Sequence, residues 1–158
     1  MTEYEKWNLV LQAVVAITAF ATLAFLYRQV RVMVDQIVAT QDASKAQSVM
    51  AIVTFLQSSE ARTSRECVRS ILSTRHHSEW TDDEKRHAAA VCANYDVVAS
   101  LLKAGLAPTG VIVANWGPSI IHCHQVLSPY ISAMRSGSGA QSSYWSNFDW
   151  LRAQAGTQ

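Results

Sequence analysis

The sequence predicts an all-α protein, in which an N-terminal transmembrane helix extends into a stalk and is followed by a cytoplasmic helical bundle of about four to five helices. Nineteen consecutive residues, Leu9 to Tyr27, carry no charge. No glycine precedes Gly105 and no proline precedes Pro108, so the strongest helix breakers are absent from the first part of the chain. Apolar residues recur at helical spacing beyond the uncharged run. The expected parts are an extracytoplasmic N-terminus at 1–8, a membrane helix at 9–27, a stalk at 28–45 and a helical domain at 46–158.

The uncharged run has the length of a membrane span. An α-helix rises about 1.5 Å per residue, so the stretch from Trp7 to Tyr27 covers roughly 30 Å, the thickness of a bilayer's hydrocarbon core. Both ends are aromatic, as is typical of membrane interfaces. A cleaved signal peptide is the alternative, but Glu3 and Glu5 stand where a signal peptide carries positive charge, and the run exceeds the usual apolar core. We therefore expect an uncleaved anchor with the lipid bilayer as its first partner.

The charges that flank the span predict its orientation. Lys6 stands alone on the N-terminal side, whereas Arg28, Arg31 and Lys45 follow the span. The positive-inside rule then places the N-terminus outside and the domain in the cytoplasm, with the span in the inner (cytoplasmic) membrane. The three cysteines lie far apart in apolar helical patterns, which indicates buried free thiols in a reducing compartment.

Apolar spacing also predicts how the membrane helix continues. After Tyr27 the helical spacing persists through Val38, so we expect a stalk of several turns. Residues 40–48 are small and polar, and form either the exposed end of that stalk or a short linker. Two further helices are predicted at 46–57 and 60–73. The second of them is expected to bury Cys67, Val68, Ile71 and Leu72.

Capping residues mark the next boundaries. Ser58 or Ser59 can cap the helix at 60–73. Thr81 and Glu84 have the spacing of a capping box, which opens a third helix at 82–104. Gly105 suits the left-handed position after that helix, where Leu106 would supply an apolar contact. The inward residues of this helix are expected to be Ala88, Val91, Cys92, Tyr95, Val98 and Leu102.

Prolines and glycines become frequent after Gly105. A short helix is predicted between Leu106 and Pro118, and Pro118 suits the first position of a fourth helix that Pro129 should kink or divide. Residues 136–143 read as a flexible loop, and the aromatic residues of 144–151 predict a turn or short helix that docks onto the bundle. The inward side of the fourth helix is expected to hold Ile120, Cys123, His124, Leu127 and Ile131.

Two histidines are the best candidates for metal ligands. His122 and His124 are two residues apart, and on a helix such residues point about 200° away from each other, so they cannot chelate one ion there. A hydrogen-bonded core histidine is the favoured interpretation of His124. No metal and no other cofactor is expected.

Three arginines are the best candidates for anion binding. Arg62, Arg65 and Arg69 form a stripe that could grip phosphates or lipid headgroups, and Trp116 could stack on a base. The alternatives are a solvated surface with intrahelical pairing to the interleaved acids, and packing of Trp116 at a helix start. For Asp96 the alternatives are a surface acid and a partner for Arg135.

Polar residues inside the span point to self-association. A glutamine amide in hydrocarbon gains by pairing with a second copy, and small residues let helix backbones approach closely. We therefore expect a homo-oligomer. The candidate association residues are Gln12, Ala16, Thr18 and Thr22.

Motifs that specify a reaction are absent from the sequence. No P-loop, dinucleotide fingerprint, Gly-x-Ser-x-Gly or His-Glu-x-x-His occurs, and a formal net charge of +1 gives no global attraction to nucleic acid. We therefore expect a protein that is not an enzyme, with histidine- or metal-based chemistry as an alternative.

The order of these parts resembles a family of uncharacterised small bacterial single-pass membrane proteins. The resemblance lies in the run Asn94-Tyr-Asp-Val-Val-Ala99 leading to Gly105, in Trp116, in Leu127-Ser-Pro129 with Arg135 after it, and in Phe148-Asp-Trp-Leu151. It implies a membrane helix followed by a cytoplasmic helical domain. It implies no activity and no binding residues.

Two functions remain open at this stage. The first is a membrane-anchored, non-enzymatic scaffold or accessory subunit that self-associates and contacts protein partners in a membrane complex. The second is a membrane effector whose cytoplasmic domain senses an anionic small molecule, such as a cyclic-nucleotide-like signal of bacterial defence, and perturbs the membrane.

Overall fold

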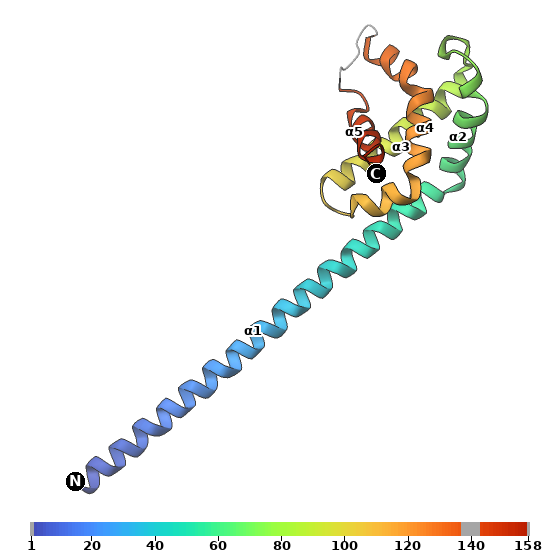
Figure 1. Cartoon of the computed structure of the whole chain (residues 1–158). Coiled ribbons are helices and arrows are strands. Elements are labelled where there is room, and N and C mark those ends of the chain that lie inside the picture. Colours follow the sequence, from blue (N-terminus) through green and yellow to red (C-terminus); the bar gives the residue numbers. More distant parts are fainter. Residues whose placement is uncertain (1, 137–142, 158) are drawn as a thin grey trace. The chain divides into compact units, whose positions relative to one another are not determined.

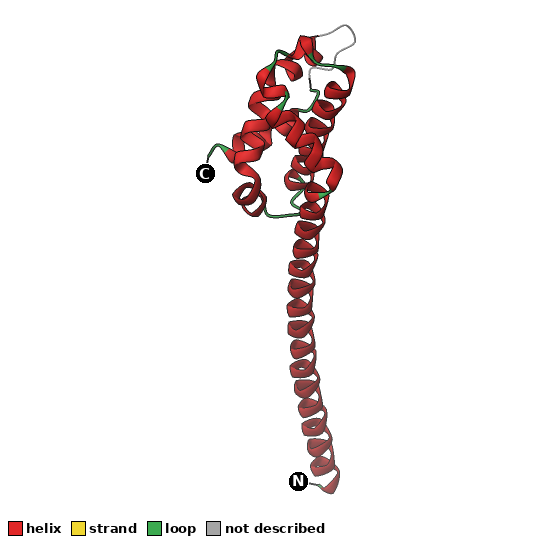
Figure 2. Cartoon of the chain, turned by 90° about the vertical axis from the view of Figure 1, so that its right-hand side faces the viewer, coloured by secondary structure: helices red, strands yellow, loops and turns green. Residues whose placement is uncertain are grey.

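A computed structural model of the protein describes residues 2–136 and 143–157. The elements follow in the order α1 (Glu3–Gln57), α2 (Ser59–Ser70), the 3₁₀ turns η1 (Leu72–Thr74) and η2 (His77–Glu79), α3 (Asp82–Lys103), α4 (Thr109–Ser136) and α5 (Ser146–Ala155) (Figure 1). Helices and short connections make up the described part of the chain, which contains no strand (Figure 2). The all-α prediction is therefore confirmed. The chain divides into two compact units, residues 1–44 and 45–158.

The first unit consists of the N-terminal part of α1. All of its described residues are exposed, including large apolar side chains such as Ile17, Phe20 and Leu23. Among the described helices, α1 alone is long and apolar enough to cross a membrane. Its apolar surface therefore has no cover within its own unit.

The end of α1 corrects one predicted boundary. The sequence predicts a separate helix at 46–57, but α1 runs without interruption from Glu3 to Gln57. The small polar residues at 40–48 contain neither glycine nor proline, so nothing in them stops a helix. This stretch is thus a continuous part of the long helix and neither its end nor a linker.

Helix α2 begins as predicted and ends earlier than predicted. The hydroxyl of Ser58 accepts a hydrogen bond from the Ala61 amide at 3.3 Å and caps the helix. The helix stops at Ser70, because the chain then tightens into η1. Val68 and Leu72 are buried as predicted, but Ile71 is exposed, since this change of winding turns it outward.

Helix α3 has both of the predicted caps. The Thr81 hydroxyl accepts a hydrogen bond from the Glu84 amide at 3.3 Å, and the Glu84 carboxylate accepts one from the Thr81 amide at 2.8 Å. At the other end Gly105 adopts φ +74°, and the amides of Gly105 and Leu106 donate to the carbonyls of Leu102 and Leu101. All six residues predicted to face inward are buried.

Helix α4 corrects the prediction for Pro118, which was expected at the first position of a fourth helix but lies inside one helix, Thr109–Ser136. Pro129 was expected to kink or divide the fourth helix; it lies inside the same helix and does not divide it. The residue before Pro118 is Gly117, which has no Cβ to clash with the proline ring, so the helical conformation is tolerated there. Buried residues on both sides of Pro118, such as Val113 and Ile120, hold the helix against the core.

Helix α5 brings the C-terminal aromatic residues onto α3 and α4, as predicted. Phe148 is fully buried and stacks on Tyr95 with ring centroids 5.1 Å apart. The predicted loop at 136–143 lies almost wholly outside the described residues.

Asp96 has a role that neither sequence alternative included. Its carboxylate accepts hydrogen bonds from the amides of Asn147 at 2.9 Å and Phe148 at 3.1 Å, and so caps α5 from the neighbouring helix α3. Arg135 instead pairs with Asp149 at 2.7 Å. Asp96 is thus neither a solvated surface acid nor the partner of Arg135.

Candidate functional site

The three candidate arginines of α2 differ in exposure. Arg62 and Arg69 are exposed, whereas Arg65 is buried with 8% of its surface accessible. Within the described part of the chain, none of the three guanidinium groups has a hydrogen bond or an ion pair. The solvated-surface interpretation is therefore wrong for Arg65.

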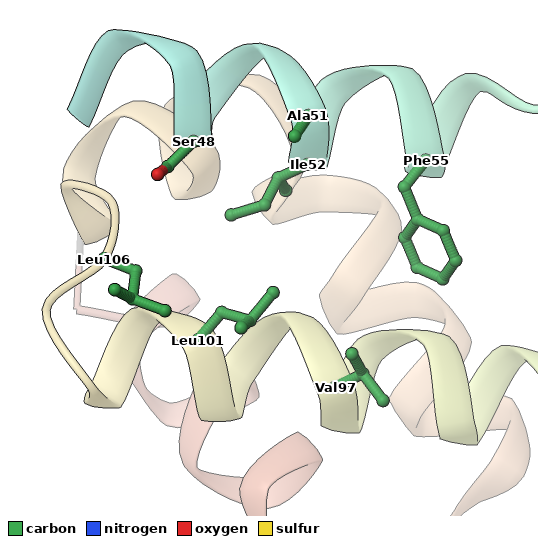
Figure 3. Close-up of a pocket in the computed structure, with 7 residues that line it drawn as sticks. All are labelled: Ser48, Ala51, Ile52, Phe55, Val97, Leu101 and Leu106. Carbon is green, nitrogen blue, oxygen red and sulfur yellow. The ribbon is translucent and has the colours of Figure 1, made fainter. Parts of the chain in front are cut away.

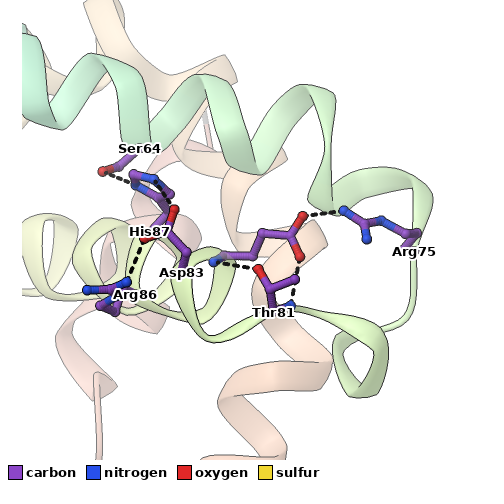
Figure 4. A network of polar contacts seen from close by, with 7 residues as sticks. Ser64, Arg75, Thr81, Asp83, Arg86 and His87 are labelled. Carbon is purple, nitrogen blue, oxygen red and sulfur yellow. Dashed lines mark hydrogen bonds and ion pairs between the residues drawn. The ribbon is translucent and has the colours of Figure 1, made fainter.

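Intrahelical pairing occurs on α3 instead. In the first turns of α3, Arg86 pairs with Asp83 at 2.8 Å (Figure 4). Lys85 pairs with Asp82 at 3.7 Å. Arg75 pairs with the Glu84 of the capping box. Asp82, Asp83 and Glu84 thus pair with basic residues of 75–86 and not with the arginines of α2.

The unpaired charges of α2 act on a buried hydroxyl pair. The Tyr95 hydroxyl lies 3.0 Å from the Ser119 hydroxyl of α4. Burial raises the pKa of Tyr95 to about 12, and the hydrogen bond with Ser119 and the positive charges of Arg65 and Arg69 lower it in part. Tyr95 therefore stays protonated and packs as a core residue.

The cysteines are free, as predicted. Cys92 and Cys123 are buried and Cys67 is half-buried. Burial raises the pKa of all three thiols, so the reactive thiolate form is disfavoured. They contribute to packing.

His122 and His124 have different surroundings. His122 is exposed, whereas His124 bonds to the Asp149 carboxylate at 2.8 Å and packs edge-on against Phe148. No group of three or more histidine, cysteine, aspartate or glutamate side chains among the described residues is arranged to hold a metal. The interpretation of His124 as a hydrogen-bonded packing residue is confirmed.

His124 and Arg135 hold Asp149 together. Burial raises the pKa of the Asp149 carboxyl, but hydrogen bonds from His124 and Arg135 lower it by more, so its pKa lies below the usual value. Arg135 also donates from Nε to the Tyr144 carbonyl at 2.8 Å. This cluster fastens α5 and the residues before it to α4.

Trp116 and the association residues occupy separate places. Trp116 is half-buried and packs against the core, as expected if it has a packing role. The Thr18 and Thr22 hydroxyls donate within α1, to the carbonyls of Val14 and Thr18, each at 2.8 Å. The Gln12 amide has no hydrogen bond among the described residues, so in a lipid environment it alone of these polar groups needs an outside partner.

An apolar groove lies in the second unit. It has a volume of about 320 Å³ and lies between the end of α1 and α3 (Figure 3). Its side chains converge from α1, from α3 and from the loop after α3, and they belong to Ser48, Ala51, Ile52, Phe55, Val97, Leu101 and Leu106.

A polar cavity of about 350 Å³ lies between the η1–η2 segment and α4. It brings Arg75, His76 and His77 together with His122 and Gln125. The sequence alone does not bring these residues together, because about 45 positions separate them in the chain. One feature of the sequence could have indicated a site here. The basic run Arg75-His76-His77 lies outside the regular apolar spacing of the predicted helices.

Comparison with known proteins places the chain in a family. No curated protein and no solved structure matches it significantly. A family model described as "Domain of unknown function (DUF4760)" matches residues 9–154, which include the apolar run and all helices of the second unit. Since the match covers most of its length, the chain belongs to the DUF4760 family.

Proposed function

We propose that the protein is a membrane-anchored, non-enzymatic helical protein that self-associates through α1 and acts through protein contacts as a scaffold or accessory subunit. The observation that carries this proposal is a seam of exposed residues along the first unit. The seam residues recur alternately at four and three positions, and are Gln12, Ala16, Ala19, Leu23, Leu26, Val30, Met33 and Ile37. This is the heptad spacing of a coiled coil.

Charge follows the same register. In this register every charged residue between Tyr27 and Ser44 falls at an outward position, b or f, of the heptad. These residues are Arg28, Arg31, Asp35 and Asp42. A surface that keeps charge off one continuous stripe is the pattern of a helix that packs against a like helix.

The seam favours two parallel copies. Val30 and Ile37 fall at a positions, and Leu26 and Met33 at d positions. β-branched residues at a, together with leucine or a similar residue without β-branching at d, favour two strands. The copies are parallel because anchors of one orientation enter the membrane from the same side.

Inside the bilayer the same seam changes its chemistry. Gln12 can bond to the Gln12 of a second copy, and Ala16 and Ala19 permit close approach of the backbones. Thr18 and Thr22 lie outside the seam, in agreement with their intrahelical bonds. The polar and small residues of the span thus support the association that the stalk favours.

The remaining parts of the proposal concern place and partners. The flanking basic residues support an N-terminus outside the inner (cytoplasmic) membrane and a cytoplasmic second unit. The apolar groove that Phe55 and Leu106 help to line offers a contact surface for a protein partner (Figure 3).

A second candidate function is an effector that senses an anionic ligand and perturbs the membrane. It is favoured by the unpaired charge of Arg65, which is buried on α2 with no anion beside it among the described residues. In this case the seam would cluster membrane helices when the second unit binds its signal.

Matched aspartate substitutions test the self-association. Ile37 and Val38 are adjacent, apolar and similarly exposed, at 57% and 51%, but only Ile37 lies in the seam. We expect Ile37→Asp to weaken the dimer about a hundredfold, because a buried charge without a partner costs several kcal/mol. Val38→Asp should leave it intact. Sedimentation of the full chain in detergent micelles measures both, and equal behaviour of the two variants would contradict the seam.

A further inference from the structure

The polar cavity of the second unit has the composition of a binding site. Its volume of about 350 Å³ is in the range of small-molecule pockets and exceeds the space of a few water molecules. The walls come from the η1–η2 segment on one side and from α4 on the other. Both polar and apolar side chains line it, and the polar ones belong to Ser73, Arg75, His76, His77, His122 and Gln125.

The polar lining is rich in hydrogen-bond donors. Arg75, Gln125 and Ser73 each carry donor groups, and the imidazoles can donate from a ring nitrogen. No carboxylate is among the lining residues. Glu84 pairs with Arg75, but a guanidinium has five N–H donors, so Arg75 can bind a second acceptor. These donors suit the oxygen atoms of an anion, and the apolar lining residues can contact the rest of a small molecule.

His77 is arranged as a donor. Its Nδ1 is buried and has no hydrogen-bond partner in the described part of the chain. A proton on Nδ1 would be a buried N–H without an acceptor, so the neutral ring places its proton on Nε2. Nε2 is thus the ring nitrogen that can donate to a molecule in the cavity.

Neighbouring rings hold His77 in position. The His76 ring lies 4.2 Å away and is itself bonded from Nδ1 to the Ser78 hydroxyl at 2.9 Å. The Trp80 ring meets His77 edge-on at 6.3 Å, and the Trp80 indole donates to the Arg75 carbonyl at 3.3 Å. The donors on this wall are therefore fixed before any ligand arrives, which lowers the entropy cost of binding.

A metal ion fits the cavity less well than an anion. Three histidines line it, but they form no group that could hold a metal among the described residues. Arg75 would add positive charge beside the ion. A phosphate group, in contrast, accepts hydrogen bonds from guanidinium, imidazole and amide donors together.

We propose that this cavity binds the phosphate group of a small molecule, with Arg75 and His77 on one wall and His122 and Gln125 on the other as donors. Phosphate binding requires neither the seam of α1 nor the arginines of α2. The site therefore differs from the candidate anion site that the sequence suggested.

Thermal unfolding of the full chain in detergent micelles, with inorganic phosphate as the probe, tests the proposal. A ligand that binds only the folded state raises the midpoint of unfolding. The dependence of this rise on ligand concentration should be the one expected for a single binding site. We expect such a concentration-dependent rise with phosphate and none with sodium chloride of the same ionic strength. Adenosine monophosphate should act at lower concentration than phosphate if the cavity also holds the group attached to the phosphate.

Three histidine variants make the test specific. His77→Ala and His122→Ala remove one donor from each wall, and His122 is exposed, so its loss leaves the fold intact. Each should raise the phosphate concentration needed for a half-maximal shift by about tenfold, because hydrogen bonds to charged groups are the strong ones. His87→Ala is the control, since His87 bonds to Ser64 at 3.1 Å outside the cavity and should leave the phosphate response unchanged (Figure 4).

Three outcomes would overturn the proposal. One is the absence of a phosphate-specific shift in the unmodified chain. Another is a shift that persists at the same phosphate concentration in both His77→Ala and His122→Ala, which would place phosphate elsewhere on the protein. A loss of response in His87→Ala as well would count against the cavity in the same way.

Discussion

The two units of this chain use apolar residues in opposite ways. In the first unit, residues such as Phe20 and Ile37 are exposed along one helix. In the second unit, residues such as Phe148 and Leu56 are fully buried in a core shared by several helices. The second unit therefore contains its own stabilisation, whereas the apolar side chains of the first unit have no cover among its described residues.

The two units are therefore expected to differ in how a phenylalanine-to-alanine substitution affects the stability of the second unit. Phe148→Ala removes a fully buried ring from the contact with Tyr95 and should destabilise the second unit by about 3–5 kcal/mol. Phe20→Ala, at a position that is 75% exposed, should leave the unfolding of the second unit unchanged. Denaturant unfolding followed by tryptophan fluorescence measures both. A similar effect of the two variants would contradict the separation of the units.

A smaller effect is expected from the cap that α3 provides to α5. Asp96→Ala leaves two backbone amides of α5 without their acceptor and should cost about 1–2 kcal/mol of unfolding free energy. Asn147→Ala removes only a side-chain contact at 3.3 Å to the same carboxylate and the Lys103 contact, and should cost less. Amide hydrogen exchange in α5 should rise in Asp96→Ala and much less in Asn147→Ala. Equal exchange in the two variants would show that the carboxylate is not the cap.

The first unit should respond to the loss of one polar group inside the span. Gln12→Leu removes the amide that can pair with a second copy, and should weaken self-association in membranes by about 1 kcal/mol, or roughly fivefold. Thr18→Val is the control, because the Thr18 hydroxyl already bonds within its own helix. Energy transfer between labelled copies in lipid vesicles measures the change. An unchanged association in Gln12→Leu would exclude the amide from the interface.

The smallest effect concerns pH and the second unit alone. The pKa of Asp149 is lower in the folded chain than in the unfolded chain, so its contribution to stability is complete above the unfolded value and is lost as pH falls through the folded value, below about pH 4. Because the carboxylate is 41% exposed, the contribution is at most about 1 kcal/mol. Asp149→Asn should flatten the pH dependence of the unfolding midpoint in this range. An identical pH profile in the variant would show that Asp149 does not contribute to the pH dependence of stability.

The sequence predicted the parts that depend on local chemistry. The capping box of Thr81 and Glu84, the left-handed Gly105 and the docking of Phe148 each follow from neighbouring residues or from apolar character, and the structure confirms them. The membrane-length helix was predicted for the same reason, since a run such as Leu9 to Tyr27 needs no tertiary information.

The parts that depend on tertiary contacts were not predicted. Pro118 remains inside a helix because Gly117 precedes it and the core holds both sides. Asp96 caps a helix about fifty residues away, and the cavity joins Arg75 with His122 across two elements. Neither distance in sequence nor residue type indicates such tertiary contacts, because the contacts form only when the helices pack together.

The central claim is that α1 pairs with a second copy along one seam, and disulfide crosslinking across the stalk tests it most directly. Single cysteines would replace seam residues Leu26, Val30, Met33 and Ile37, or outward residues Arg28, Arg31 and Asp35, in a Cys67→Ser chain kept in its membrane. Symmetric copies that pair along the seam bring equivalent seam positions within disulfide reach and hold outward positions apart. The account predicts covalent dimers at the four seam positions and few at the three outward ones. Crosslinking of equal extent at both sets, or at neither, would contradict it.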